Sequence, residues 1–388
     1  MAKRRDVVIV GGGISGTAAA YELARGGAAV TLVEMGALAS MASGWTLAGV
    51  RQSGRHPAEL PLARAAVCRW QGLAEELGAD LEYRQNGNLR LARDPDEGAM
   101  IAAMVKEQRA LGLDISFLPN SQAVQAVAPA IAESVLAASF CPGDGHANPI
   151  ATVTAFAAAA ARHGAEIRTG TAVTAITQAG GRVSGVETIN GPIAADVVVV
   201  AAGVYTGRLC QGLGLSFPLA IDHVSVVQTV PLPPLLDQVL GVAGAGFAGR
   251  QEVSGQLRVT GGIQPWHRPR DRHDDDLVQP AAAAVAATLA RGMAVLPALA
   301  EARIARVWGG LIDTTPDALP VIERAPEIDG LIIAAGFSGH GFCLGPVTGE
   351  IIRDLVGEGQ TAHPIAPFRR NRFAHQSAAA HQATALHG

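Results

Sequence analysis

The order of hydrophobic and polar positions at the start of the chain predicts a strand, a tight turn, a helix and a second strand. An apolar run at 7–10 leads directly into the glycine-rich segment 11–16, and a helical pattern follows at 17–25. Gly26-Gly27 ends that helix, and the apolar run 28–33 has the pattern of a second buried strand. Buried strands joined by a helix are typical of a βαβ unit in a parallel sheet.

The turn has the sequence GGGISG, and each part of it has a physical role in binding a dinucleotide. Gly11 permits the sharp turn, Gly13 lets the backbone approach a pyrophosphate, and Gly16 lets the helix pack closely on the strand. Ile14 and Ser15 lead into the helix, at whose start free N–H groups and the helix dipole favour a bound phosphate. The segment therefore predicts a nucleotide site.

Glu34 stands at the end of the second predicted strand, 18 residues after Gly16. Its carboxylate is placed to accept hydrogen bonds from ribose hydroxyls, which predicts an adenosine without a 2′-phosphate. A GxGxxG pattern alone is weak evidence in a chain with 46 glycines. The strand, the helix and the acid around it favour a nucleotide site over a packing loop, but they do not say which dinucleotide binds.

Later segments alternate between buried strands, helices and half-buried strands. The pattern predicts helices at 61–77, 97–111, 119–131, 150–163 and 281–293, and strands at 83–91, 166–169, 172–177, 183–188, 196–200, 224–230, 256–262 and 331–335. Strand 196–200 returns to the nucleotide sheet, whereas the alternating strands after 217 predict a separate antiparallel sheet that covers it. We therefore expect an α/β protein with a Rossmann-like domain (1–85, 146–216 and 307–370), a substrate domain (86–145 and 217–306) and a C-terminal tail (371–388).

Composition narrows the class of protein. The chain has 388 residues, of which 49% are hydrophobic and 16% charged, so it is long enough for two domains with an ample core. A formal net charge of −4 leaves no electrostatic footprint for nucleic acid, and no run approaches the roughly 20 apolar residues that span a bilayer. Four scattered cysteines without a CxxC pair give no disulfide framework, zinc site or iron–sulfur site, so we expect a cytoplasmic protein.

Several polar residues are candidates for a site. Arg51 and Arg55 are the first cations after the nucleotide motif, and either can hold a carboxylate in a bidentate fork or lie on the surface. Asp144 and His146 lie in a segment rich in glycine and proline, and we interpret them as turn residues. The histidines and aspartates of 265–276 have the mixed charge of a solvated loop, so we expect no metal site.

A second glycine-rich segment lies near the end of the chain. The sequence GLIIAAGFSGHGFCLGPVTGE at 330–350 places a strand before a loop at 336–345, and a helix continues to about Val356. The N–H groups of that loop and the start of the helix form a second site for developing negative charge. Two such sites at opposite ends of one chain predict a long cofactor stretched between them.

Four segments together resemble a known family: GGGISG with Glu34, ADVVVVAAG, DTTPDALPVI and IAAGFSGHGF. They resemble the flavin-dependent amino-acid and imino-acid oxidoreductases related to D-amino-acid oxidase, glycine oxidase and sarcosine oxidase, over nearly the whole chain. The resemblance implies a Rossmann-like FAD-binding domain and a second, antiparallel-sheet (α+β) substrate domain. It also implies that flavin N5 removes a hydride from the carbon beside an amine, giving an imine that water hydrolyses.

The same resemblance implies roles for single residues. Arg51 would orient the substrate carboxylate and His340 would lie beside the flavin, so these two are the catalytic candidates. The remaining residues implied to contact FAD are Val173 near the adenine, Ala202 and Gly203 against the cofactor, and Gly336, Gly339, Gly341 and Phe342 with His340 along the pyrimidine side.

Departures from the family pattern refine the expectation. Monomeric sarcosine oxidases attach FAD to a cysteine where this chain has Gly310, so we expect noncovalent FAD. In those enzymes a lysine immediately after GHGF binds the substrate carboxylate. This chain has Cys343 at that position, so we expect Arg51 to bind the carboxylate instead. The predicted strand 256–262 has no lysine of the kind that promotes reaction with oxygen in sarcosine oxidase relatives, which favours a dehydrogenase.

Two segments, GWTLAGVRQ and GFSGHGFCLGPVTGEIIRDLV, resemble the β subunits of heteromeric dehydrogenases. Those enzymes act on opines, proline, D-hydroxyproline or sarcosine. This implies a second, α-type subunit, which would carry any FMN or [2Fe–2S] centre. We therefore expect an FAD-dependent dehydrogenase of a secondary amine or amino acid. A nicotinamide dehydrogenase, an amino-acid oxidase that acts alone with oxygen and a non-catalytic flavoprotein subunit stay open as alternatives.

Overall fold

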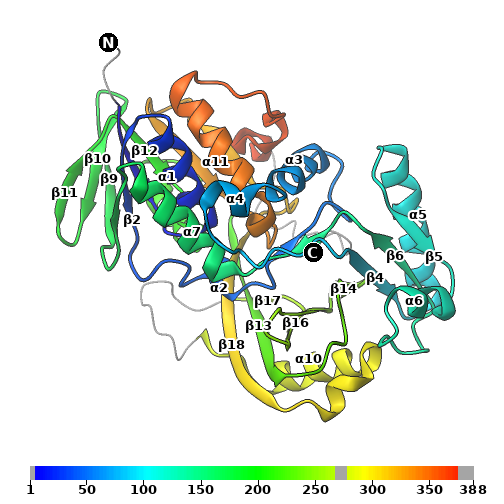
Figure 1. Ribbon diagram of the computed structural model, residues 1–388. Coiled ribbons are helices and arrows are strands. Elements are labelled where there is room, and N and C mark those ends of the chain that lie inside the picture. Colours follow the sequence, from blue (N-terminus) through cyan, green and yellow to red (C-terminus); the bar gives the residue numbers. More distant parts are fainter. Residues whose placement is uncertain (1–4, 267–277, 375–388) are drawn as a thin grey trace.

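A computed structural model describes residues 5–266 and 278–374 of the chain (Figure 1). Most of the polar loop 265–276 and of the predicted tail 371–388 lies outside the described residues. The described part contains two large sheets, one mainly parallel and one mainly antiparallel, with helices on both. The predicted α/β fold class agrees with this arrangement. The predicted domain boundaries stay a prediction.

The six-stranded sheet holds the nucleotide motif. Its strand order is β19-β20-β12-β1-β2-β8, and its neighbours are parallel except for the antiparallel pair β19 and β20. The bounds are β1 Asp6–Val10, β2 Ala29–Val33, β8 Glu166–Arg168, β12 Val197–Val200, β19 Val321–Arg324 and β20 Leu331–Ala335. Because β2 and β12 lie on opposite sides of β1, the chain turns in opposite directions from this strand, which is where open parallel sheets bind ligands.

Alternate side chains of β1 face two different layers. Val7 and Ile9 join the core formed with the helices α1 (Ile14–Arg25), α7 (Pro149–Arg162) and α11 (Gly341–Gly357). Val8 and Val10 join the core under a three-stranded sheet made from β9 (Val173–Ala179), β10 (Arg182–Thr188) and β11 (Gly191–Ala194). A strand buried on both faces in this way has the continuous apolar run that the sequence shows.

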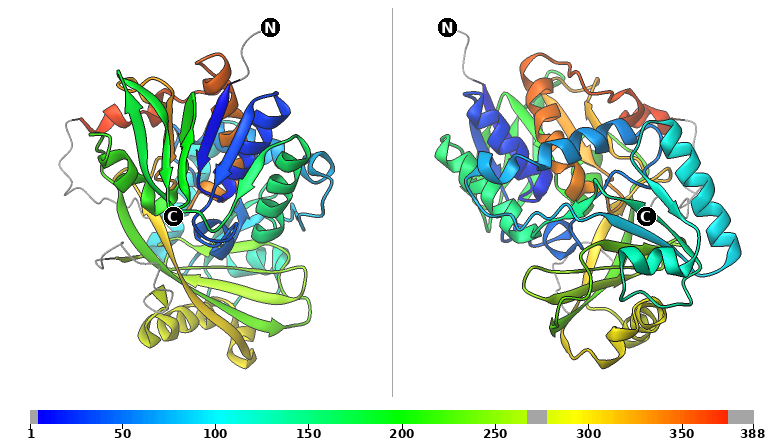
Figure 2. Two further views of the ribbon diagram at one scale, coloured as in Figure 1. Left: turned by 90° about the vertical axis from the view of Figure 1, so that its left-hand side faces the viewer. Right: turned by 45° about the vertical axis from the view of Figure 1, so that its right-hand side comes forward.

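The nine-stranded sheet lies next to the part of the molecule that contains the six-stranded sheet (Figures 1 and 2). Its order is β17-β13-β16-β15-β14-β4-β6-β5 with β18 paired to β13, and only β14 and β4 are parallel. The bounds are β4 Asn88–Ala92, β5 Ser116–Leu118, β6 Ala137–Cys141, β13 Ala220–Pro231, β14 Val239–Val242, β15 Phe247–Gln251, β16 Gln256–Gly261, β17 Gln264–Pro265 and β18 Ile304–Thr314. Helix α10 (Ala282–Val295) covers its outer face (Figure 2).

The remaining elements are short or lie at the edges. They are α2 (Ala42–Trp45), β3 (Gly49–Val50), α3 (Leu60–Trp70), α4 (Leu73–Leu77), α5 (Pro95–Ala110), α6 (Ser121–Val127), β7 (Gly145–His146) and α8 (Thr206–Gln211). The single helix predicted at 61–77 is wrong, because a break at Gln71-Gly72 divides it into α3 and α4. The strand predicted at 83–91 begins only at Asn88, after Gly87 with a φ of 95°.

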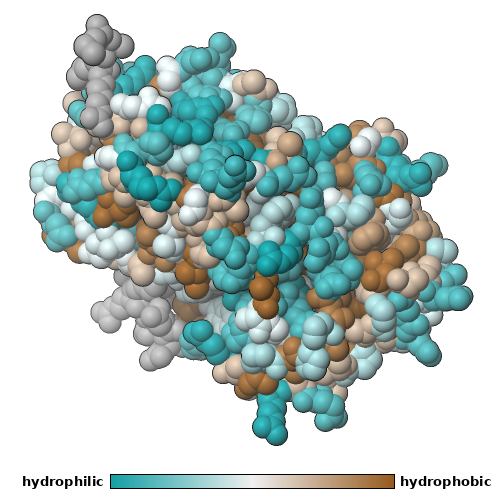
Figure 3. Space-filling model, viewed as in Figure 1, coloured by the Kyte–Doolittle hydropathy of each residue, from teal (hydrophilic) through white to brown (hydrophobic). Residues whose placement is uncertain are grey.

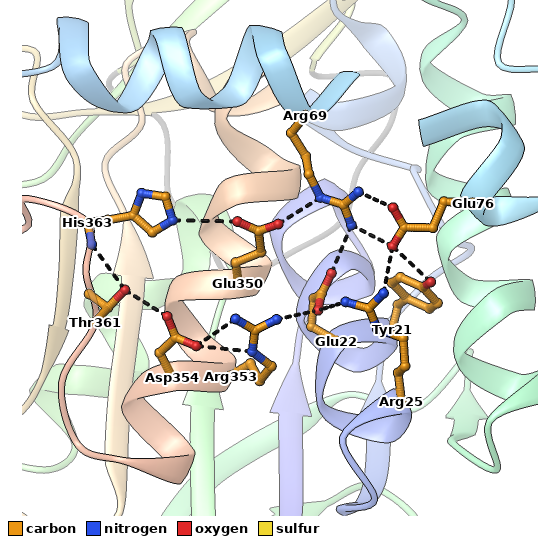
Figure 4. A network of polar contacts seen from close by, with 10 residues as sticks. All are labelled: Tyr21, Glu22, Arg25, Arg69, Glu76, Glu350, Arg353, Asp354, Thr361 and His363. Atoms are coloured by element: carbon orange, nitrogen blue, oxygen red, sulfur yellow. Dashed lines mark hydrogen bonds and ion pairs between the residues drawn. The ribbon is translucent and has the colours of Figure 1, made fainter. Parts of the chain in front are cut away.

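A network of ion pairs ties the helix of the first glycine motif to that of the second (Figure 4). Glu22 of α1 is only 1% exposed, and its carboxylate lies 3.0 Å from Arg69 of α3 and 2.9 Å from Arg353 of α11. Arg25 pairs with Glu22 at 2.7 Å and also with Glu76 of α4 at 3.0 Å. The network therefore fixes α1 and α11 relative to each other.

The surface seen in Figure 3 is mostly hydrophilic, and its hydrophobic residues occur in small groups rather than as one continuous face. Scattered exposed apolar residues are normal on a folded chain. Within residues 5–266 and 278–374, none of the helices combines the length and the apolar character that a membrane crossing needs.

Candidate cofactor and substrate site

Two adjoining cavities begin where the parallel strands end. The first cavity has a volume of about 300 Å³ and lies at the ends of β1, β2 and β12. The second cavity has a volume of about 310 Å³ and lies between the two large sheets. They share the residues Gly13, Ala42, Ser43, Ala201, Gly203 and Asp313. A long ligand can therefore extend from one into the other.

The predicted cofactor residues divide between these cavities. Gly11, Gly13, Glu34, Val173, Ala202 and Gly203 line the first cavity. Gly13, Ile14, Ser15, Arg51, Gly203, Gly339, Gly341 and Phe342 line the second cavity. Gly16, Gly336 and the catalytic candidate His340 are absent from both linings. The structure thus brings together residues that lie more than 300 positions apart in the sequence.

The glycine turn can be built only with glycine at two positions. Gly11 has a φ of 116°, and a Cβ atom on it would lie 2.2 Å from the carbonyl oxygen of Ala201. A Cβ atom on Gly16 would lie 2.0 Å from the carbonyl oxygen of Gly11. Both approaches are far shorter than van der Waals contact, so the turn can lie this close to β12 and to α1 only without side chains here.

Side chains hold the donors of this turn beside the first cavity. Glu34 accepts hydrogen bonds from the backbone N–H groups of Gly12 at 2.6 Å and Gly36 at 2.8 Å. Ser43 accepts a bond of 3.0 Å from the N–H of Ile14 at the start of α1. The hydroxyl of Ser40 lines the same cavity, is buried and has no hydrogen-bond partner among the described residues. These groups suit a ligand rich in hydroxyl and phosphate oxygens.

The segment 41–47, which contains α2 and lines both cavities, is held by residues of the nine-stranded sheet. Arg250 of β15 donates to the carbonyl oxygen of Leu47, and Arg258 of β16 donates to that of Thr46 at 2.9 Å. Thr46 and Leu47 line the second cavity. The sequence alone did not single out either arginine, because their partners are backbone carbonyls some 200 positions earlier in the chain.

Three arginines line the second cavity: Arg55 and Arg90 are buried, and Arg51 is half-buried. Burial and the neighbouring charges of Arg55 and Arg90 hold the pKa of Arg51 well below its ordinary value. Burial and Arg55 lower the pKa of Arg90 to about 10. Like charges that repel each other in a buried wall favour an anion in the cavity. Arg90 was missed in the sequence, although it lies within the predicted strand 83–91.

Cys343 and Asp144 fix the backbone around Arg51. The sulfur of Cys343 accepts a bond of 3.3 Å from the N–H of Arg51, and burial raises the pKa of this thiol to about 11. Asp144 accepts bonds from the N–H groups of Gln52 at 2.9 Å and Ser53 at 3.2 Å. Cys343 therefore helps to position the backbone of Arg51.

His146, expected in a turn, lies in strand β7 and contacts the nine-stranded sheet. His146 is buried, and its Nδ1 lies 3.1 Å from the Nη1 atom of Arg250. Burial and the charge of Arg250 lower the pKa of His146 to about 3. Within the described part of the chain, no group of three or more histidine, cysteine, aspartate or glutamate side chains is arranged to hold a metal ion.

His340 points away from both cavities. Its ring is 3% exposed, and its Nδ1 atom lies 3.0 Å from one carboxylate oxygen of Glu59 and 3.2 Å from the other. Burial and Arg55 lower the pKa of His340 to about 4, so at neutral pH the ring is uncharged and donates its Nδ1 proton to Glu59. Burial raises the pKa of Glu59, but His340 and Arg55 outweigh it and lower this pKa to about 2. This geometry favours a positioning role for His340.

Asp313 is a further residue that the sequence did not reveal. It lines both cavities, and its carboxyl oxygen accepts a bond of 2.5 Å from the N–H of Gly336. Burial raises the pKa of Asp313. Gly336 therefore acts on the site through Asp313, at the place where the two cavities meet.

Comparison with known proteins identifies the family. A family described as "FAD dependent oxidoreductase" (DAO) matches residues 6–355. The chain belongs to the DAO family of FAD-dependent oxidoreductases. The resemblance predicted from the motifs and the prediction of FAD are thereby confirmed, and the nicotinamide alternative is set aside.

Three DAO-type relatives show the extent of the similarity. Glycine oxidase of Geobacillus kaustophilus (strain HTA426) is 30% identical over 384 residues, which cover 96% of this chain and 98% of that protein. Sarcosine oxidase subunit beta of Rhizobium meliloti (strain 1021) is 28% identical over 375 residues, covering 95% and 88%. The crystal structure of L-proline dehydrogenase from P. horikoshii has a TM-score of 0.86 and 27% identity, covering 96% of this chain and 99% of that one.

The residues of both cavities fit FAD. The glycine turn, the unpartnered Ser40 hydroxyl and the carboxylate of Glu34 suit the adenosine diphosphate part. The second cavity offers an apolar lining beside the start of α11, where Gly339, Gly341 and Phe342 meet it, and this suits an aromatic ring that becomes negatively charged on reduction.

Proposed function

We propose that this DAO-family protein is a dehydrogenase of a secondary amine or an amino acid, such as an opine, proline, hydroxyproline or a sarcosine-like compound. The observation that carries the proposal is the second cavity, where three arginines, two of them buried, line a space that adjoins the nucleotide cavity. FAD, when bound, supplies the acceptor of a hydride from the carbon beside the amine, and water hydrolyses the resulting imine.

The residues of the second cavity orient the substrate and control its charge. Arg51 holds a carboxylate group, which places the neighbouring C–H bond for transfer. The positive charges of the three nearby guanidinium groups disfavour the protonated form of the substrate amine. The amine therefore loses its proton more readily in this cavity. The apolar side chains of β13, β14 and β15 in the lining exclude water.

His340 and Glu59 are buried next to this site but do not line the second cavity. The hydrogen bond between them joins the start of α3 to the start of α11. That link holds the loop whose residues Gly339, Gly341 and Phe342 meet the second cavity. Asp313 holds the same loop at Gly336. Both contacts supply position rather than proton transfer.

Three features support the finer parts of the proposal. Among the described residues, neither lining contains a lysine, which supports a dehydrogenase over an oxidase that acts alone with oxygen. Neither lining contains any of the four cysteines, which supports noncovalent FAD. Relatives named sarcosine oxidase subunit beta support a heteromeric assembly with an α-type subunit, which would carry any FMN or [2Fe–2S] centre. A cytoplasmic location stays a prediction.

The test is anaerobic titration of the purified, FAD-loaded chain. We expect flavin absorption near roughly 370 and 450 nm, as the cofactor requires, and bleaching of the upper band by a carboxylate-bearing amine. Slow reoxidation by oxygen and rapid reoxidation by an artificial acceptor would favour the dehydrogenase. If none of these amines bleaches the flavin of the folded protein, with or without its partner subunit, the result would favour the non-catalytic alternative.

A further inference from the structure

The positive charge of the second cavity comes from two separate parts of the chain. Arg51 and Arg55 follow β3, whereas Arg90 belongs to β4 in the nine-stranded sheet. Asp313 is the only acidic side chain among the described residues of this lining, and its carboxyl group already accepts a hydrogen bond from Gly336. The lining therefore carries more positive than negative charge.

The charge of Arg55 acts on both of the other arginines. After burial, its charge is the largest influence that lowers the pKa of Arg51, and it is the neighbouring charge that lowers the pKa of Arg90. A carboxylate pairs best with one guanidinium group through two parallel hydrogen bonds. Three such groups in one cavity lining therefore exceed what the single carboxylate of a simple amino acid requires.

Arg55 also has a buried donor that no protein group satisfies. The side chain is 4% exposed, and its Nε atom donates to the carbonyl oxygen of Arg51 at 3.2 Å. Its Nη1 atom is buried and has no hydrogen-bond partner among the described residues. Glu59, the acid that attracts it, is bonded to His340 and does not line the cavity. Leaving a charged donor unpaired is costly, so a ligand anion that reaches Nη1 is strongly favoured.

We propose that the substrate carries two carboxylate groups, one bound at Arg51 and the other at Arg55 and Arg90. The substrate class is then an N-carboxyalkyl amino acid or a similar amine flanked by two acids. This inference rests on the proposed function, because it places the substrate in the second cavity. Asn88, which precedes Arg90 by two positions on the same strand and also lines the cavity, supplies a further amide donor beside the second carboxylate.

Binding of unreactive acids to the FAD-loaded chain tests the inference without catalysis. Malonate, succinate and glutarate are titrated against acetate, propionate and butyrate at about 0.15 M salt, and the shift of the flavin spectrum and the heat of binding are recorded. We expect the best diacid to bind at least about tenfold more tightly than the best monoacid. Equal binding of the two classes would overturn the inference, as would inorganic phosphate binding as tightly as the best diacid.

Variants locate the second carboxylate. Arg55→Gln should reduce the preference for diacids to within about twofold, while Arg55→Lys should keep part of it, since lysine retains the charge but not the fork. The matched control is Arg64→Gln, because Arg64 is exposed on α3, does not line the cavity and donates to the carbonyl oxygen of Leu111. An unchanged preference in a folded Arg55→Gln protein would overturn the assignment. The acid titration of the unaltered protein stands even if this variant does not fold.

The experiment separates this inference from the proposed function. Bleaching by amines with one carboxylate, without any advantage for diacids, would keep the function and remove the inference. Selective binding of diacids without bleaching by any amine would keep the two-carboxylate site and remove the function.

Discussion

The two cavities are built in opposite ways. About half of the residues that line the first cavity come from one stretch, residues 10–43, which contains the turn after β1 and the end of β2. The charged wall of the second cavity consists of side chains from β4, the segment 51–55 and β18, which the nine-stranded sheet brings together. Local structure within one stretch therefore shapes much of the first cavity, whereas long-range packing assembles the charged wall of the second.

This difference predicts where a single methyl group does most damage. Gly11→Ala should destabilise the fold by about 3 kcal/mol or more and abolish FAD binding, because the new Cβ atom would meet the carbonyl oxygen of Ala201 at 2.2 Å. Thermal unfolding and the flavin content of the purified chain measure both effects.

Gly27→Ala is the matched control for that substitution. Gly27 also has a positive φ, 86°, but nothing lies within 4 Å of the position of its Cβ atom. We expect a cost of about 1 kcal/mol from backbone strain alone, with normal FAD content. If both variants lose FAD equally, close approach to β12 is not what selects glycine at Gly11.

The sequence predicts the parts of the site that are built from neighbouring residues better than the parts that folding brings together from distant segments. The turn Gly11–Gly16, Glu34 and strand 331–335 follow from residues adjacent in the chain, and β20 has the predicted bounds. Arg90, Arg250 and Asp313 could not be found in this way, since each matters only through residues far from it in sequence. The long strand β18 was missed because its glycines interrupt the alternating pattern.

Glu22 tests whether the two glycine loops depend on each other. Glu22→Gln removes the charge that pairs with Arg69 and Arg353 and leaves their guanidinium groups short of a partner (Figure 4). We expect a loss of about 3 kcal/mol in the free energy of unfolding, measured by denaturant titration. Glu75→Gln on α4, where no described ion pair is removed, should change it by less than about 0.5 kcal/mol.

A substitution of Arg51 tests the role of the charged wall of the second cavity. Arg51→Gln should lower kcat/KM for carboxylate-bearing amines about a hundredfold, since a charge-assisted pair with the substrate is lost, while FAD content stays normal. Rapid anaerobic reduction of the flavin measures this, with Arg64→Gln as the control. An unchanged kcat/KM would assign the carboxylate to another group of the second cavity.

The smallest expected effect concerns the hydrogen bond between His340 and Glu59, which holds the loop at the second cavity. The pKa of His340 is lowered from 6.5 to about 4, so between these values the unfolded chain binds a proton that the folded chain does not. Stability should therefore fall by about 2 kcal/mol as the pH drops from about 6.5 to about 4. Glu59, with its pKa lowered to about 2, adds a further loss only below about pH 4.5.

His340→Asn separates this contribution from the others. Asparagine retains a donor for Glu59 but does not titrate, so the variant should lose less stability than the unaltered protein between about pH 6.5 and 4. His146, whose pKa is lowered to about 3, contributes to the same range in both proteins and cancels in the difference. Parallel curves of unfolding free energy against pH would mean that His340 is protonated equally in the folded and unfolded chain. The ring would then carry a positive charge beside Glu59 at acidic pH, and its link between α3 and α11 would be an ion pair.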